Sequence, residues 1–444
     1  MEKSKVCKRI ERIEPGVSAI DIGSEALFVA VAGEPVKRFG TFTSEMVLLG
    51  RYLQEQGVER VAMEATGVYW IPLHDHLDKC GFEVTVFNGA HARNLPGRKT
   101  DVSDCQWHAM LHSHGLLSPC FIPDARIREL RSLYRLREDQ VGLSAMYIQH
   151  MQKALILMNV RLHDVISQIT GVSGMRVMEA IVAGERDAKK LTALCDAQIL
   201  KRKRESVEAS LEGHWEEHHI FGLRQALEGY RFCQAQMAAC DEQIERWLQE
   251  QTKDLERQWP QGTSVTRHNA PLIKDLHAEL VTLCNGRDAT VLPGIGPLGF
   301  LKLVGEIGTD LSVWKSEKHF TSWLGLAPGR HESGKRRRRV SRRKTVAGQI
   351  FKEGAMSLAR SKHVALGGFY RRLKGRTCAA VANTATARKI AELYYRMMTQ
   401  GLEYVEQGLE EYEKQYKQHT LKRLKKQATQ FGLTLIENPT GVVM

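Results

Sequence analysis

Four acidic residues in the first quarter of the sequence have local settings that suit a metal-dependent phosphodiester site. Asp21 lies near the end of the first strand in residues 18–32, which are predicted to form a strand, a tight turn and a second strand. Glu64 ends a short apolar run. Asp101 and Asp104 are three residues apart near the start of a predicted helix, so they project from one helical face. Carboxylates at strand ends and at a helix start can hold divalent cations on a scissile phosphate.

Each of these acids also has a simpler interpretation. A single aspartate at a strand end is usually solvated, and Glu64 alone would be a surface carboxylate. Asp101 alone would cap the helix, together with Thr100 and Ser103. Carboxylates gathered without a cation would repel one another and raise some of their pKa values, and a bound cation removes that cost. The order strand, strand, helix favours a metal site for the set as a whole.

A serine beside a dense basic run is the second candidate for chemistry. Ser333 precedes a stretch in which eight of ten residues are basic, and the hydroxyl of Ser333 could attack phosphorus to form a phosphoserine intermediate. Arginines pair with phosphate oxygens and stabilise the charge that builds during such an attack. Ser341 is a competing serine, and a solvated loop that binds a nucleic-acid backbone without specificity is the simpler interpretation. The basic residues are Lys335, Arg336, Arg337, Arg338, Arg339, Arg342, Arg343 and Lys344.

A glycine turn lies upstream of this run, in residues 289–308. The segment predicts a helix-hairpin-helix in which Gly294 and Gly296 form a tight turn. The backbone N–H groups of that turn and the N-terminus of the next helix can bind a phosphate without reading bases. The simpler interpretation is a helix that ends in a Schellman-type glycine turn.

Composition indicates a globular protein with a polyanionic partner. The chain has 444 residues, of which 43% are hydrophobic and 26% are charged, and its formal net charge is +13. Nucleic acid is therefore the favoured partner. No apolar stretch approaches the roughly 20 residues that span a bilayer, and the N-terminus is too polar for a secretory signal, so we expect a cytoplasmic protein, associated with the nucleoid and with no membrane contact. The nine cysteines contain no C-x-x-C pair, which predicts reduced thiols.

The pattern of apolar residues changes twice along the chain. Residues 15–120 alternate strand-like and helical runs, which predicts an α/β domain with a central sheet. Residues 126–285 have helical periodicity over long stretches, which predicts either a projecting antiparallel hairpin or coiled coil, used for dimerisation, or an ordinary helical bundle. A loop is expected around residues 257–271, and a further helix from near Val346.

Taken together, these motifs resemble the IS110/IS1111 family of insertion-sequence transposases. The resemblance is carried by AIDIGSEALFVAVAG, MEATGVYW, GRKTDVSDCQWHAMLHSHGLL, LPGIGPLGFLKLVGEIG and WLGLAPGRHESGKRRRR, and it covers residues 15–150 and 285–375. It implies an RNase H-like (RuvC-like) N-terminal domain over 1–150, a helical coiled-coil segment over 151–285, a mostly α-helical transposase domain with the helix-hairpin-helix over 286–380, and a helical tail over 381–444.

The resemblance also implies a chemistry and a set of partners. The acidic quartet falls on Asp21, Glu64, Asp101 and Asp104, which would bind Mg²⁺, or Mn²⁺ in its place, and the nucleophile falls on Ser333. Members of the family resemble recombinases that a structured noncoding RNA guides to donor and target DNA. Strand exchange would pass through a covalent serine–DNA link in a homo-oligomer, a dimer or a synaptic tetramer. This chain departs from the family pattern in the density of its Lys/Arg run after Ser333, and the run contains Ser341.

Three alternatives belong to other functional classes. A metal-only nuclease of the Holliday-junction type would use water as the nucleophile, and a covalent protein–DNA adduct would exclude it. A noncatalytic nucleic-acid-binding protein would keep the basic surfaces and lack Mg²⁺-dependent cleavage. An actin-like sugar kinase shares the opening strand with its aspartate, but it would need further glycine-rich phosphate loops that the sequence does not contain.

Overall fold

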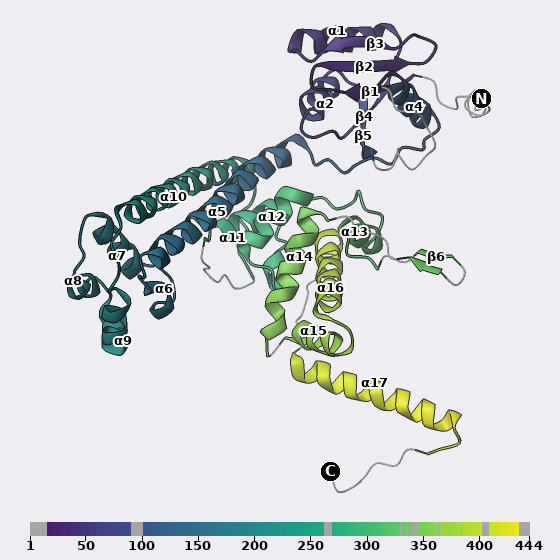
Figure 1. Cartoon of the computed structure of the whole chain (residues 1–444). Coiled ribbons are helices and arrows are strands. Elements are labelled where there is room, and N and C mark those ends of the chain that lie inside the picture. Colours follow the sequence, from purple (N-terminus) through teal and green to yellow (C-terminus); the bar gives the residue numbers. More distant parts are fainter. Residues whose placement is uncertain are drawn as a thin grey trace. The chain divides into compact units, whose positions relative to one another are not determined.

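The computed structural model of the protein describes residues 16–89, 101–261, 269–328, 331–333, 336–338, 344–362, 364–401 and 408–434. For residues 101–103, 331–333, 336–338 and 409 it describes the backbone alone. The chain divides into two compact units, Met1–Ile122 and Pro123–Met444, and each is described by itself (Figure 1). This division lies at the start of a long helix, whereas the predicted boundary at residue 150 falls inside that helix.

The first unit is built on a mixed five-stranded sheet. Its strands are β1 (Val17–Ile22), β2 (Ala26–Val31), β3 (Lys37–Gly40), β4 (Arg60–Glu64) and β5 (Glu83–Phe87), in the spatial order β3-β2-β1-β4-β5. The β1-β2-β3 part is antiparallel, and β4 and β5 run parallel to β1. A turn in which the N–H of Gly23 donates to the carbonyl of Ala26 (2.9 Å) joins β1 to β2. The predictions of a strand, turn and strand in residues 18–32 and of an α/β domain with a central sheet are confirmed.

Helices cover both faces of this sheet. The helices α1 (Thr43–Glu55) and α2 (Trp70–Lys79) lie on one face, over large side chains such as Ile20 and Met63. The helix α4 (Asp101–Ser113) lies on the other face, over the small side chains of Ala19, Ala30 and Ala62. Because side chains alternate along a strand, large and small residues at successive positions give the sheet two different faces. The alanine face allows α4 to lie close to the strands.

A long antiparallel helix pair opens the second unit. The helices α5 (Ala125–Leu157) and α10 (Glu217–Thr252) lie side by side (Figure 1). Their contacts pair Arg137 with Asp241 and Ser144 with Gln234, so residue numbers rise along one helix as they fall along the other. The predicted antiparallel hairpin is confirmed, and supercoiling of the pair stays a prediction.

Four short helices form a cap at the far end of this pair. They are α6 (Leu162–Val165), α7 (Val172–Val182), α8 (Ala188–Ala193) and α9 (Ala197–Ser210). Their apolar residues share one core with the ends of α5 and α10, including Leu155, Met178 and Leu223. The hairpin therefore ends in a small packed lobe.

In the rest of the second unit, the regular elements that the structure describes are helices and one short pair of strands. Its elements are α11 (Leu276–Leu283), the 3-10 helix η2 (Ala289–Val291), α12 (Pro297–Ile307), α13 (Glu317–Trp323), β6 (His331–Ser333), β7 (Arg336–Arg338), α14 (Val346–Ser357), the 3-10 helix η3 (Leu358–Arg360), α15 (Ala365–Arg376), α16 (Ala379–Gln400) and α17 (Leu409–Gln430). An aromatic cluster of Phe320, Phe351 and Tyr394 packs α13, α14 and α16 together. The predicted helix from near Val346 is confirmed, and the predicted boundaries at 285/286 and 380/381 fall between α11 and η2 and inside α16.

Polar contacts fix α12 against the base of α5. The Glu306 carboxylate is buried, and it accepts hydrogen bonds from the Tyr134 hydroxyl and from Nε of Arg135 (2.8 Å). Nη2 of Arg131 donates to the backbone carbonyl of Glu306 (2.6 Å). A buried carboxylate is stable only with such partners, so these bonds set how α12 lies on α5. No helix in the part of the chain that the structure describes is long and apolar enough to cross a membrane.

Candidate active site and nucleic-acid interface

Asp21 and Glu64 lie at the carboxyl ends of two neighbouring parallel strands. In the register of β1 and β4, Ile20 pairs with Met63, so Asp21 and Glu64 come next on each strand. Both side chains are partly exposed. Adjacent parallel strands lie about 4.8 Å apart, so this register brings the two acids to one edge of the sheet.

The same two acids share a face with α4. Two residues before them stand Ala19 and Ala62, whose side chains belong to the core beneath that helix. Because side chains two positions apart point to the same face of a strand, Asp21 and Glu64 project on the side that α4 covers. That helix carries Asp104. The structure therefore brings three of the four predicted acids to one end of the sheet and one face.

Cys105, next to Asp104, ties α4 to the strands. Its Sγ donates to the backbone carbonyls of Ala19 (3.1 Å) and Phe28 (2.9 Å). Burial raises the pKa of Cys105 to about 12, and the negative charge of Asp21 adds to this rise, while hydrogen bonds from the backbones of Asp21 and Ala30 oppose it. The Asp21 carboxylate is thus close enough to act electrostatically on the first turns of α4.

Glu64 rests directly on a glycine that follows β5. A Cβ built on Gly89 would lie 1.8 Å from Oε1 of Glu64. Real Cβ atoms do not approach other heavy atoms so closely, and any side chain at position 89 would displace the carboxylate. Gly89 thus positions Glu64. The only sequence signal for this contact is a glycine two residues after a strand.

His108 lies one helical turn after Asp104 on the inner side of α4. Its ring packs edge-on against Phe87, with 4.8 Å between centroids. Burial lowers the pKa of His108, and the charge of Asp104 partly offsets this fall. His108 therefore favours its neutral form beside the acids, and sequence analysis did not single it out.

Asp101 is the first residue of α4, which agrees with its predicted place near the helix start, and its side chain lies outside the described part of the structure. The described side chains contain no group of three or more His, Cys, Asp or Glu residues that are close enough together to hold a metal ion. The oxygen donors of Asp21, Glu64 and Asp104 suit Mg²⁺, which prefers carboxylates and retains several waters. The donor types fit the ion, and the fourth acid belongs to the same helix start.

Ser333 is the last residue of β6 and belongs to the second unit. It pairs with Arg336 in the antiparallel ladder of β6 and β7, where Glu332 pairs with Arg337 and His331 with Arg338. This pairing places the serine backbone beside the first arginines of the basic run. Lys335, Arg339, Ser341, Arg342 and Arg343 lie outside the described residues.

Lys344 connects this region to α14. Its side chain is exposed, and the next residue, Thr345, caps the helix with an Oγ1 that accepts a hydrogen bond from the N–H of Gly348 (3.0 Å). The N-terminus of α14 thus directly follows the basic run. The positive end of a helix dipole favours an anion there.

The predicted glycine turn packs against the backbone of α14. Gly294 has a φ of +87°, and a Cβ built on it would lie 2.5 Å from the carbonyl oxygen of Gly354. Gly296 has open space around its Cα and precedes the first turn of α12. Packing alone therefore explains the glycine at 294. The two helices of the predicted helix-hairpin-helix correspond to η2, a single 3-10 turn, and α12, with α11 before them.

A pocket of about 420 Å³ lies beside this turn. Its lining includes Gly296, Leu298, His277, Lys302 and Glu353. The buried carboxylate of Asp288 orients His277 by accepting a hydrogen bond from its Nε2 (2.9 Å). The same carboxylate accepts a hydrogen bond from the hydroxyl of Thr290 (2.7 Å). The sequence signal for this network was the short Asp-Ala-Thr cap before the turn.

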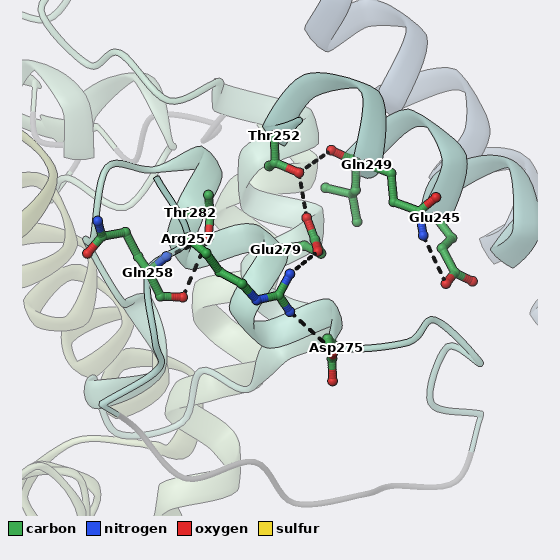
Figure 2. Close-up of polar contacts among 9 residues, drawn as sticks. Glu245, Gln249, Thr252, Arg257, Gln258, Asp275, Glu279 and Thr282 are labelled. Atoms are coloured by element: carbon green, nitrogen blue, oxygen red, sulfur yellow. Dashed lines mark hydrogen bonds and ion pairs between the residues drawn. The ribbon is translucent and has the colours of Figure 1, made fainter. Parts of the chain in front are cut away.

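A second polar network holds α11 against the end of α10 (Figure 2). Glu279 accepts from the Thr252 hydroxyl (2.6 Å) and from Nη1 of Arg257 (2.8 Å). Nη2 of Arg257 also donates a hydrogen bond to the carboxylate of Asp275 (3.2 Å). Asp275 directly precedes α11 and has a φ of +51°. Asp275 is part of the pocket lining. These bonds fix one wall of the pocket.

Comparison with known proteins gives two matches to models of protein families. Residues 19–159 match the IS110 DEDD transposase model, described as a transposase. Residues 289–370 match a model described as transposases of the IS116/IS110/IS902 family. The first match contains all four predicted acids, and the second contains the glycine turn, Ser333 and the basic run. No curated protein matches the sequence.

Proposed function

We propose that this protein is an RNA-guided recombinase that exchanges DNA strands through a phosphoserine intermediate. The proposal starts from the assignment that both matches support, a DNA transposase of the IS110/IS116 family. Family membership by itself covers DNA as substrate and a general need for a divalent metal. The proposal adds the identity of the metal, the nucleophile and the guide. The observation that carries it is the placement of Asp21 and Glu64 on adjacent strand ends, on the face where α4 carries Asp104.

In this proposal the four acids hold Mg²⁺, with Mn²⁺ as a substitute. The ion would polarise the scissile phosphate as a Lewis acid. Asp21 and Glu64 would supply oxygens from the sheet, and Asp101 and Asp104 would supply oxygens from α4. Gly89 keeps Glu64 in place, and Cys105 holds α4 on the strands.

Ser333 would perform the covalent step. Its Oγ attacks phosphorus, an Oγ–P bond forms, and the bond from phosphorus to the deoxyribose oxygen of the departing strand breaks. That oxygen leaves with a proton, and the serine has lost one. In the second step a hydroxyl of the incoming strand attacks the phosphorus of the phosphoserine, a P–O bond to that strand forms and the Oγ–P bond breaks. The attacking hydroxyl loses its proton, and the Oγ of Ser333 regains one. Arg336, Arg337, Arg338 and Arg339 would stabilise the charge on the phosphate oxygens.

The partners in the proposal are donor and target DNA, a structured guide RNA and further copies of the chain, as a dimer or a synaptic tetramer. A net charge of +13 supports polyanionic partners. Gly296 and the first turn of α12 would contact the backbone of one of them, while Gly294 mainly allows the turn to pack on α14.

The decisive experiment looks for a protein-linked DNA strand. Purified protein with its co-purified RNA is incubated with both DNA partners and Mg²⁺, and the products are separated under denaturing conditions. We expect an adduct with wild type and with Ser341→Ala, and none with Ser333→Ala, Asp104→Asn, RNase treatment or chelation of the metal. The proposal fails if Ser333→Ala still forms the adduct. Cleavage without any adduct would instead indicate a metal-only nuclease.

A further inference from the structure

We propose that the exposed basic face of α17 is a binding surface for the phosphate backbone of duplex DNA. This helix lies beyond residue 370, where the second family match ends. The inference depends on the proposed function only in taking DNA as the substrate. It concerns a different part of the chain from the acids and Ser333.

Charge is distributed unevenly along α17. Acidic residues occur only at its start, at Glu410, Glu411 and Glu413, and residues 414–434 contain no Asp or Glu. Six basic residues follow, and all six are exposed; they are Lys414, Lys417, Lys422, Arg423, Lys425 and Lys426. Like charges at three- and four-residue spacing destabilise an isolated helix. A bound polyanion would remove that cost.

One side of α17 is held by α15. The guanidinium of Arg372 lies 3.6 Å from the ring centroid of Tyr416 and 5.5 Å from that of Tyr412, and it pairs with Glu413 (3.7 Å). The hydroxyl of Tyr416 also accepts a hydrogen bond from Arg376. These contacts involve the first two turns, and the rest of the helix extends away from α15 (Figure 1).

The basic residues lie away from this contact. At about 100° per residue, Lys414, Lys417 and Lys425 stand at about 200°, 140° and 220° from Tyr412, on the side opposite the one that contacts α15. Lys422, Arg423 and Lys426 lie beyond the two turns that contact α15, where their side chains are exposed. From position 414 to 426 these residues extend for about 18 Å.

Duplex DNA is the ligand that this surface fits best. The duplex has a regular spacing of negative charge, about one for every 1.7 Å of its axis, and several flexible basic side chains along one helix can follow it. Sequence-specific recognition of RNA generally uses aromatic rings that stack on unpaired bases. The two tyrosines of α17 are instead engaged by Arg372. The surface therefore suits sequence-independent contacts with a duplex backbone.

A matched pair of triple variants of the full chain tests the proposal. The first is Lys422→Gln/Lys425→Gln/Lys426→Gln in α17. The control is Lys201→Gln/Arg202→Gln/Arg204→Gln, which removes three exposed cations from α9. Both variants lower the formal net charge from +13 by three, to +10, so a general effect of charge would appear in both. Affinity for a 30-base-pair duplex is measured as a function of salt.

We expect the α17 variant to weaken binding roughly 10- to 100-fold at 0.1 M salt and to make the slope of log K against log salt shallower by about 3, since each phosphate contact contributes about 0.9. The control should leave both values close to those of wild type. At saturating DNA the α17 variant should still form the serine adduct, so failure of this proposal and of the proposed function can be told apart.

Three results would overturn the inference. The first is an α17 variant that binds duplex DNA like wild type or like the α9 control. The second is a loss of affinity confined to structured RNA, which would identify RNA as the ligand. The third is a change in oligomer mass by sedimentation with unchanged DNA affinity, which would identify α17 as a contact between copies of the chain.

Discussion

At the scale of single residues, a missing side chain decides where Glu64 can lie. We expect Gly89→Ala to reduce Mg²⁺-dependent strand cleavage by tenfold or more, because the new Cβ displaces the Glu64 carboxylate, and errors of about 1 Å in placement can cost about 100-fold in rate. Cleavage assays check this. The control is Gly142→Ala in α5. A Cβ built there would meet no neighbouring element within 4 Å, and alanine should stabilise the helix by about 0.5–1 kcal/mol. Equal activity of the two variants would show that Gly89 does not position the acid.

The glycine turn allows packing and binding to be separated. Gly294→Ala should lower the free energy of unfolding of the second unit by about 2 kcal/mol or more, since its φ of +87° and its contact with Gly354 both exclude a Cβ. Gly296→Ala has open space and should cost less than about 1 kcal/mol. Urea denaturation measures both. Similar losses for the two variants would contradict the close packing of the turn on α14.

His108 should make the stability of the first unit depend on pH. Burial lowers its pKa in the native state, so the native state binds fewer protons than the unfolded chain. The free energy of unfolding is therefore highest above the pKa of histidine in the unfolded chain, about 6.5, where His108 is neutral in both states. It decreases as the pH falls below that value. We expect the urea midpoint of wild type to decrease when the pH is lowered from 7.5 to 5.5. The same change of pH should lower the midpoint of His108→Gln by less. An equal fall in the variant would assign the pH dependence to other groups.

At the scale of elements, a buried ion pair joins the two long helices. Nε of Arg137 donates to Asp241 (2.5 Å), both side chains are about 97% buried, and Asp241 also accepts from the N–H of Leu272 (2.9 Å). Asp241→Ala removes the carboxylate that accepts hydrogen bonds from the buried Arg137 and leaves the more distant Glu138 (4.0 Å) and the carbonyl of Asn269 (3.0 Å), so we expect a loss of about 3 kcal/mol. The exposed neighbour Glu242, paired with Arg246 at 3.6 Å, provides the control, and Glu242→Ala should cost less than about 0.5 kcal/mol. Denaturation curves with equal shifts would refute this difference.

The sequence predicted elements better than it predicted contacts. The strands around Asp21 and Glu64 and the helix that begins at Asp101 were predictable because their apolar periodicity is local. The contact of Gly89 with Glu64 was not, because it depends on the register of β4 with β5. The packing of Gly294 on Gly354 joins residues 60 positions apart, and no local pattern encodes it.

At the scale of the whole molecule, the predicted chemistry is divided between two compact units. The four acids belong to residues 1–122, and Ser333 belongs to residues 123–444. As part of the proposed function, we propose that the acids of one protomer and the serine of another would build one composite site. Each unit keeps its own core, so a substitution in one unit leaves the other intact. Inactive variants of the two kinds can therefore be combined in one oligomer.

We expect a mixture of Asp104→Asn and Ser333→Ala chains, refolded or co-expressed together, to recover part of the adduct that neither forms alone. A composite site between protomers would take its acids from the Ser333→Ala chain and its serine from the Asp104→Asn chain. With random assembly of dimers, about half are mixed and half of their sites are intact, so roughly a quarter of wild-type adduct should return. The linked strand should be found only on the Asp104→Asn chain, which a size tag identifies. A mixture as inactive as its components, with mixed oligomers present, would place the acids and the serine of one site in the same chain.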